Sequence, residues 1–192
     1  MINLKSVLNN ENVLIIKNSR FICLTYQISL KNEIAKILED VKIKYPNATH
    51  YCYAYILDNE RHESDDGEPS GTAGMPILQV LEKNGLNHVL CIVVRYFGKI
   101  KLGAGGLVRA YTKSAVECIK DKIIFLKKGY EVEISFDYEY LKKIDYLLKD
   151  VKILNKEFEK NIIYNLYVDL ELFDKLKSFD FIEMNILREL YF

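Results

Sequence analysis

Residues 88–118 read HVLCIVVRYFGKIKLGAGGLVRAYTKSAVEC, and this stretch does most to decide the fold. It begins with a nearly continuous apolar run, His88–Phe97, which predicts a strand that is covered on both faces. A flexible loop over Gly98–Gly106 follows and leads into a helix whose apolar residues recur at helical spacing. A buried strand followed by a glycine-containing loop and a helix indicates a domain that mixes sheet and helices.

The residues before this stretch predict further strands and helices of the same domain. In chain order these are a strand pair over 13–28, a helix after an N-cap at Ser29, a strand over 50–57, a long acidic loop over 58–74 and a helix that opens at Pro76. A loop of that length in a small domain is more often functional than idle.

The remaining residues predict a smaller second domain. Strands are expected over 131–136, 152–157, 162–168 and 185–190, with helices over 140–149 and 170–178. This βαββαβ order suits a ferredoxin-like sheet with two helices on one face. We place the boundary near Phe125–Gly129 and expect an α+β protein with domains of residues 1–125 and 126–192.

The composition excludes several classes of protein. With 192 residues, 49% of them hydrophobic and 28% charged, the chain is expected to fold rather than to be disordered. The longest apolar run, Val89–Val94, is too short to span a bilayer, and Met1–Asn12 lacks a signal-peptide pattern, so we expect a cytoplasmic protein without a membrane partner. The four cysteines form no pair at metal-ligand spacing, so we expect reduced, buried thiols, no metal and no cofactor.

A basic stretch provides the first candidate site. From Lys83 to Val116 there are six basic residues and no acidic one. Most of them surround the glycines of the loop over 98–106. The residues expected to contact phosphate there are Arg95, Lys99, Lys101, Gly105, Arg109 and Lys113. Cationic side chains beside exposed backbone amides suit phosphodiester contact, although solvated lysines around a turn are the alternative.

An earlier glycine cluster precedes the helix that opens at Pro76. The backbone amides of Gly71, Thr72, Ala73 and Gly74 lie where a helix dipole favours an anion. The alternative is a structural turn, because no Lys-Ser/Thr of a phosphate-binding loop follows.

Three tyrosines, Tyr51, Tyr53 and Tyr55, alternate along one strand and therefore project from one face. Exposed rings would stack on bases, whereas half-buried rings would keep only their hydroxyl groups at the rim.

The acidic loop provides a third candidate site, because six carboxylates fall within eleven positions. His50, Asp65, Asp66 and Glu68 could perform acid–base chemistry or hold Mg²⁺ on a phosphate-bearing or peptide substrate. A solvated loop is the commoner explanation for such a cluster. A third interpretation is that the carboxylates pair with the basic stretch and hold the loop closed until an anion competes.

Three ordered motifs resemble the YigZ/IMPACT family: THYCYAY over 49–55, SDDGEPSGTAGMP over 64–76, and VVRYFG over 93–98 together with LGAGGLVRAY over 102–111. The resemblance implies a first domain similar to the second domain of ribosomal protein S5 and a ferredoxin-like second domain. Both similarities point toward RNA and the ribosome. Two departures change the charge, since Lys99 stands where a glycine is usual and Met75 where a basic residue is often found.

The leading hypothesis is therefore a translation-associated protein that binds RNA or the ribosome. One alternative is a hydrolase or other enzyme that uses the region of His50, Asp65, Asp66 and Glu68. A second alternative is an adaptor that binds only protein.

Overall fold

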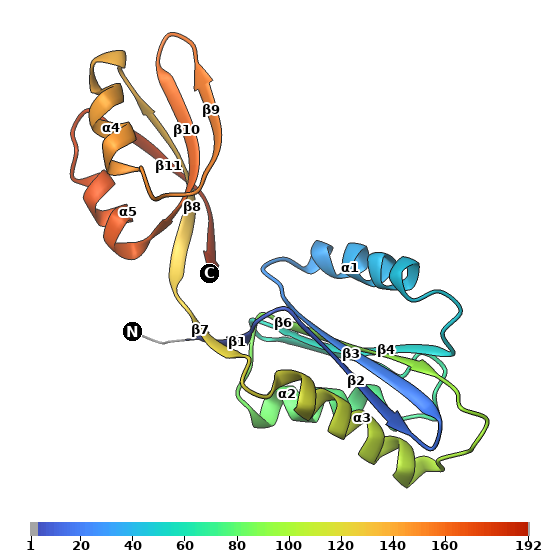
Figure 1. The fold of residues 1–192 in the computed structure, drawn as a ribbon. Coiled ribbons are helices and arrows are strands. Elements are labelled where there is room, and N and C mark those ends of the chain that lie inside the picture. The colour runs from blue at the N-terminus through green and yellow to red at the C-terminus, as the bar shows by residue number, and fades with distance from the viewer. Residues whose placement is uncertain (1–3, 192) are drawn as a thin grey trace. The chain divides into compact units, whose positions relative to one another are not determined.

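The structure, a computed structural model, describes residues 4–191 and contains two compact units (Figure 1). One unit extends to Phe125 and the other begins at Leu126. Both mix strands and helices, so the chain is an α/β protein with several sheets.

The first unit is built on a five-stranded antiparallel sheet in the order β2-β3-β6-β4-β5. The strands are β2 (Asn10–Ile16), β3 (Ser19–Gln27), β4 (His50–Leu57), β5 (Glu60–Ser64) and β6 (Val89–Tyr96). The central strand β6 is buried from Val89 to Arg95, which confirms that the apolar run is covered on both faces.

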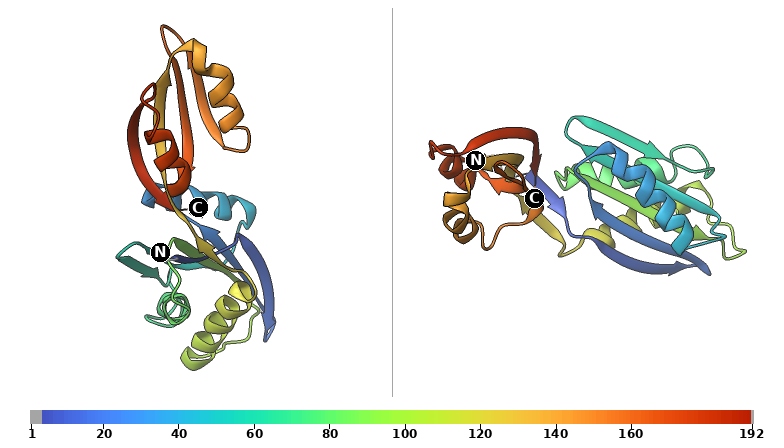
Figure 2. Two further views of the ribbon diagram at one scale, coloured as in Figure 1. Left: turned by 90° about the vertical axis from the view of Figure 1, so that its left-hand side faces the viewer. Right: turned by 90° about the horizontal axis from the view of Figure 1, so that it is seen from above.

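Helices cover both faces of this sheet (Figure 2). Helix α1 (Lys31–Lys44) packs on one face through Ile34 and Val41, together with residues of β3 and β6. Helices α2 (Gly74–Lys83) and α3 (Ala104–Ile119) pack on the other face. Burying one aliphatic side chain stabilises the fold by about 1.5–3 kcal/mol, so the two cores on either side of β6 hold this unit together.

Two predictions about local structure are wrong in part. The predicted loop over 58–74 contains strand β5, which pairs with β4 after a tight turn at Asp58, where φ is 53°. The polar composition of β5 conceals it, because this strand lies at the sheet edge and has exposed side chains. The N-cap of α1 is Leu30 rather than Ser29. A short two-stranded sheet of β1 (Leu4–Val7) and β7 (Ile123–Leu126) was not predicted.

The second unit has the element order βαββαβ that its sequence predicts. Its elements are β8 (Lys128–Phe136), the 3₁₀ turn η1 (Tyr138–Tyr140), α4 (Leu141–Leu147), β9 (Ile153–Phe158), β10 (Ile162–Asp169), α5 (Leu170–Lys177) and β11 (Glu183–Tyr191). The sheet order is β11-β8-β10-β9, and neighbouring strands are antiparallel. Alternate residues of β8 and β10 are buried against α4 and α5, so the helices cover one face of this sheet.

Within residues 4–191, no helix combines the length and the apolar composition that crossing a membrane requires.

Candidate functional site

The start of α2 is already occupied by a carboxylate of the protein itself. Asp65 accepts hydrogen bonds from the backbone N–H groups of Gly71 at 2.7 Å and of Ala73 and Gly74 at 2.9 Å each. Partial burial raises the pKa of Asp65, but the three backbone hydrogen bonds outweigh it and hold the pKa below its ordinary value. The amides of this cluster are therefore not free for phosphate.

The fourth residue of that predicted cluster, Thr72, is buried. Both its backbone N–H and its hydroxyl group donate to the carbonyl oxygen of Pro69, at 3.0 and 2.6 Å. The prediction that residues 71–74 bind an external anion is thus corrected, because an internal carboxylate and a turn satisfy these donors. The alternative, a structural turn, describes this cluster.

Asp66 also serves the backbone. Its Oδ2 atom accepts from the N–H of Tyr51 at 2.6 Å, and its carbonyl oxygen lies 2.8 Å from Nδ1 of His50. Because a carbonyl oxygen can only accept, Nδ1 of His50 donates this bond, which fixes the orientation of the imidazole. Asp65 therefore attaches the acidic loop to the start of α2, and Asp66 attaches it to the start of β4.

The third carboxylate of the loop, Glu68, forms a buried ion pair. Its Oε1 atom accepts from Nη1 of Arg95 at 2.5 Å and from the hydroxyl of Tyr111 at 2.7 Å, and both charged side chains are almost fully buried. Burial raises the pKa of Tyr111 far above its ordinary value, so this hydroxyl remains a donor. One pair between the acidic loop and the basic stretch therefore exists, as the third interpretation of the loop required.

A pocket of about 430 Å³ lies beside this ion pair. Its lining combines polar residues with apolar ones: Thr49, His50, Glu68, Pro69, Arg95, Phe97, Lys101, Leu102, Gly103, Ala104 and Leu107. The Nε2 atom of His50 is 3.9 Å from Oε2 of Glu68, so these two predicted residues do come together. A concave, mostly apolar pocket with a few convergent polar groups is typical of a ligand site.

The start of α3 opens on this pocket and differs from the start of α2. Its N-cap is Gly103, at φ 70°, which makes no side-chain cap, and its first turn contains no acidic residue. The first backbone N–H groups of a helix have no partner within the helix, and the helix dipole favours an anion beside them. Gly103 and Ala104 both line the pocket, and the predicted Gly105 follows in the first turn.

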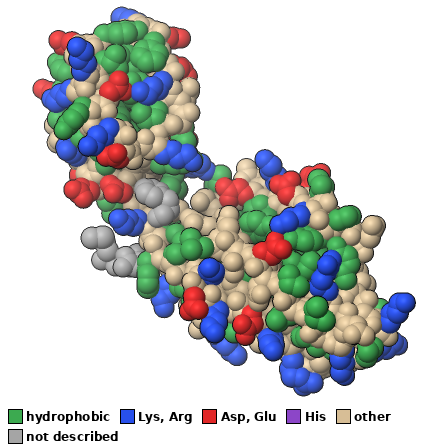
Figure 3. Space-filling view, in the orientation of Figure 1, with side chains coloured by type: hydrophobic (Ala, Val, Ile, Leu, Met, Phe, Trp, Pro, Cys, Tyr) green, Lys and Arg blue, Asp and Glu red, His purple; other side chains and the backbone are tan. Residues whose placement is uncertain are grey.

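The other predicted cations lie at the surface. Lys99, Lys101, Arg109 and Lys113 are exposed, whereas Arg95 is 5% exposed. Figure 3 shows Lys and Arg side chains along the lower edge of the first unit, the side on which Figure 1 draws α2 and α3. Four of the predicted cations are therefore available to solvent, whereas Arg95 is a buried partner of Glu68.

Backbone geometry explains the glycines before α3. A Cβ atom at Gly98 would collide with the backbone of Asn18 and Ser19, so a close approach of two chain segments requires glycine there. Lys99 has φ of 66°, in the left-handed region that favours glycine. Lysine at this position therefore adds a positive charge at a conformational cost.

The tyrosines of β4 do not form an exposed stacking platform. Tyr55 is buried and donates to Glu60 at 2.6 Å, and Tyr51 is half-buried and donates to the carbonyl of Tyr45 at 2.6 Å. Tyr53 is also half-buried, and all three pack in the core beneath α1. The stacking prediction is corrected because the face they share is the one that α1 covers.

Two residues of the site were missed at the sequence level. The sequence places Tyr111 only in the motif over 102–111 that runs into the expected helix, and Phe97 only at the end of the expected strand. A fully buried tyrosine requires a hydroxyl partner, but the sequence cannot show which carboxylate supplies it. No group of three or more His, Cys, Asp or Glu side chains within residues 4–191 is arranged to hold a metal ion.

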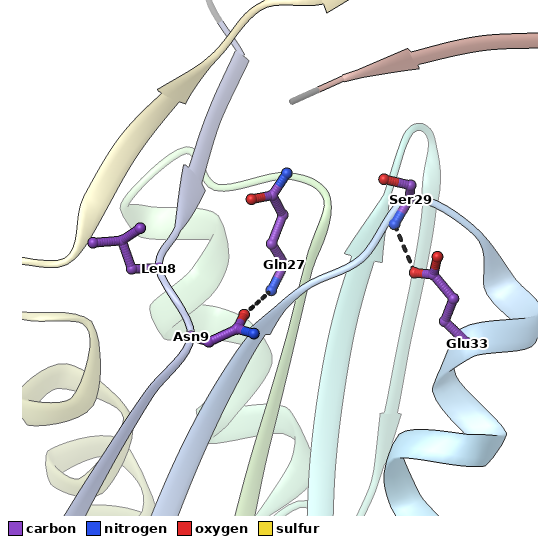
Figure 4. A pocket seen from close by; sticks show the side chains of 5 residues that line it. All are labelled: Leu8, Asn9, Gln27, Ser29 and Glu33. Atoms are coloured by element: carbon purple, nitrogen blue, oxygen red, sulfur yellow. Dashed lines mark hydrogen bonds between the residues drawn. The ribbon is translucent and has the colours of Figure 1, made fainter. Parts of the chain in front are cut away.

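A second pocket, of about 550 Å³, lies near the start of α1 (Figure 4). Its polar groups are used internally, because Asn9 Oδ1 accepts from the N–H of Gln27 and Glu33 Oε2 accepts from the N–H of Ser29, each at 2.9 Å. The pocket beside Arg95 is therefore the stronger candidate.

The fold and the site define a mixed α/β protein with a pocket at a helix start, lined by Lys101 and by the Arg95–Glu68 ion pair. Residues 17–119 match the model of the Impact N-terminal domain. IMPACT family member YvyE of Bacillus subtilis is 41% identical over 83% of this chain and 76% of its own length. IMPACT family member YigZ of Escherichia coli is 33% identical over 77% of this chain and 76% of its own. The chain belongs to the IMPACT family, as its motifs suggested.

A solved structure, described as the crystal structure of an hypothetical protein, matches 98% of this chain and 98% of its own. The identity is 28% and the TM-score is 0.65.

Proposed function

We propose that this protein is a translation-associated RNA-binding protein and that RNA phosphates bind at the start of α3. One observation carries the proposal: the starts of α2 and α3, the two helices on one face of the sheet, differ. Asp65 neutralises the start of α2, whereas the start of α3 has no acidic cap and faces the pocket lined by Arg95 and Lys101.

The exposed cations support this proposal. Lys99, Lys101, Arg109 and Lys113 are exposed and lie just before or within α3. Cations that neutralise phosphates release condensed counterions, so binding through them depends on salt rather than on sequence. The resemblance of the motifs to the IMPACT family supplies the link to translation, with the ribosome as the expected partner and the cytoplasm as the expected location.

We also propose that the first unit has the fold of the second domain of ribosomal protein S5 and that the second unit is ferredoxin-like. The element order βαββαβ and the antiparallel strand order β11-β8-β10-β9 support the second assignment.

Co-sedimentation with ribosomes and with free ribosomal RNA at low and at physiological salt tests the function. Lys99→Ala/Lys101→Ala is expected to weaken binding and to flatten the dependence on salt, because fewer phosphates are neutralised. Lys36→Ala/Lys42→Ala, which removes two exposed lysines from α1, is the matched control and should bind like the wild type. Equal binding by both double variants and the wild type would contradict the site.

An enzymatic function is the second candidate, and the position of His50 favours it. Its Nδ1 atom is anchored to the carbonyl of Asp66, and its Nε2 atom faces Glu68 across 3.9 Å beside the pocket. A histidine oriented in this way could act as a general base. Hydrolysis of a phosphate ester or peptide by the wild type, lost in His50→Ala with RNA binding intact, would establish this function instead.

A further inference from the structure

The carboxylate of Glu68 has one oxygen that its neighbours leave available. Its Oε1 atom accepts from Arg95 and Tyr111, but its Oε2 atom lies 3.9 Å from Nε2 of His50, beyond hydrogen-bond range. The Glu68 side chain is 3% exposed and lines the pocket. A carboxylate oxygen at the wall of a pocket, with accepting capacity left over, is stabilised by a hydroxyl or N–H donor of a ligand.

Arg95, in contrast, has a hydrogen-bond donor that lacks an acceptor. Within residues 4–191 its Nε–H is buried and has no acceptor, although the guanidinium donates to Glu68 through Nη1. The guanidinium carbon lies 5.4 Å from the centre of the Phe21 ring and 5.5 Å from that of Phe97. Packing near two rings restricts the guanidinium, so Nε–H cannot turn toward another acceptor of the protein.

The pocket therefore lacks an acceptor at Arg95 and a donor at Glu68. Lys101 and the first amides of α3 add further donors for an anion, while Phe97 and Leu102 offer apolar surface. A ligand that matches this lining carries an anionic oxygen, a hydroxyl group and a flat or apolar part within about 430 Å³. A ribonucleotide combines all three, because its phosphate, ribose hydroxyl and base are joined in one unit.

We propose that the pocket binds one ribonucleotide unit, with its phosphate at Arg95, Lys101 and the start of α3 and a ribose 2′-hydroxyl donating to Oε2 of Glu68. This inference rests on the proposed function and adds to it a reason to prefer RNA over DNA, because only RNA offers the 2′-hydroxyl. The carboxylate of Glu68 does not repel the phosphate strongly, because Arg95 neutralises its charge and Lys101 supplies the net positive charge of the pocket.

The test compares three oligonucleotides of one sequence by fluorescence anisotropy with the wild-type protein at physiological salt. These are single-stranded RNA, the corresponding DNA and 2′-O-methyl RNA, which keeps the ribose but removes the donor. We expect RNA to bind about tenfold or more tightly than either of the others, the difference that one hydrogen bond to a charged acceptor makes. Competition with a ribonucleoside monophosphate and its deoxy form shows whether a free nucleotide suffices.

Two variants add a readout on the protein side. Glu68→Gln should bring the RNA-to-DNA affinity ratio toward one, whereas Lys101→Ala should weaken both strands equally and keep the ratio. If Glu68→Gln fails to fold, the comparison of oligonucleotides on the wild type decides alone. Equal binding of all three strands would overturn the ribose contact while leaving the proposed function standing. Binding of none would overturn both.

Discussion

Replacing Asp65 by Ala is the most direct perturbation of the first unit. The substitution removes the acceptor of three backbone N–H groups, those of Gly71, Ala73 and Gly74. A hydrogen bond to a charged group contributes about 1.5–3 kcal/mol, but Asp65 is only half-buried and the released amides can partly reach water. We therefore expect the free energy of unfolding to fall by about 2–4 kcal/mol, out of a usual total of about 5–15 kcal/mol.

The contribution of Asp65 to the free energy of unfolding also depends on pH. The folded-state pKa of Asp65 lies below its ordinary value, so its contribution is complete above the unfolded pKa of about 4 and is lost as pH falls through the folded pKa. The difference in stability between wild type and Asp65→Ala should therefore be constant near neutral pH. It should shrink in more acidic solution.

Denaturation by guanidinium, followed by circular dichroism, measures the stability, and hydrogen exchange measures the three amides directly. Asp40→Ala, at an exposed position on α1, is the matched control and should change stability by less than about 0.5 kcal/mol. The amides should exchange faster only in Asp65→Ala. Unchanged exchange at Gly71, Ala73 and Gly74, with a stability loss no greater than that of the control, would refute the reasoning.

Three further predictions concern the same unit. Arg95→Met should lower the free energy of unfolding by about 3–5 kcal/mol, because it leaves Glu68 buried and unpaired. Adding Glu68→Leu should recover part of that loss in the same denaturation experiment. A loss below about 1 kcal/mol would argue against a charged pair. Lys99→Gly should leave the free energy of unfolding unchanged or raise it by up to about 1 kcal/mol, because φ is 66°, in the left-handed region that favours glycine. The same variant should weaken RNA binding in the anisotropy assay. A clear loss of stability would contradict the backbone argument. Iodoacetamide at pH 8 should leave all four buried cysteines unmodified by mass spectrometry until the protein is unfolded, and burial raises the pKa of Cys52 to about 12.

Much of the fold could be predicted because its patterns are local. The apolar run of β6, the helical spacing of α3 and the βαββαβ order of the second unit all follow from side-chain periodicity. Strand β5 was missed because an edge strand with polar, exposed side chains carries no such periodicity. Its position in the sheet depends on pairing with β4, which is a tertiary fact.

The candidate site was predicted by residue type but not by role. Arg95 and Lys101 were identified from charge alone, yet one is buried against a carboxylate and the other is exposed at the pocket. Charge along the chain does not report burial, because burial depends on what packs above the residue. The glycine cluster over 71–74 looked like an open anion site for the same reason.

The sequence by itself determined the family, the element order of the second unit and the two glycine clusters that precede helices, because these are properties of consecutive residues. Only the tertiary structure decided which helix start is neutralised. The loop folds back so that Asp65 accepts from the amides at the start of α2, whereas no acidic side chain caps α3. The tertiary structure also joined Glu68 to Arg95 and Tyr111, which are 27 and 43 positions away along the chain. Contacts between residues so distant in sequence arise only when the sheet and its helices pack, and the pocket exists for that reason.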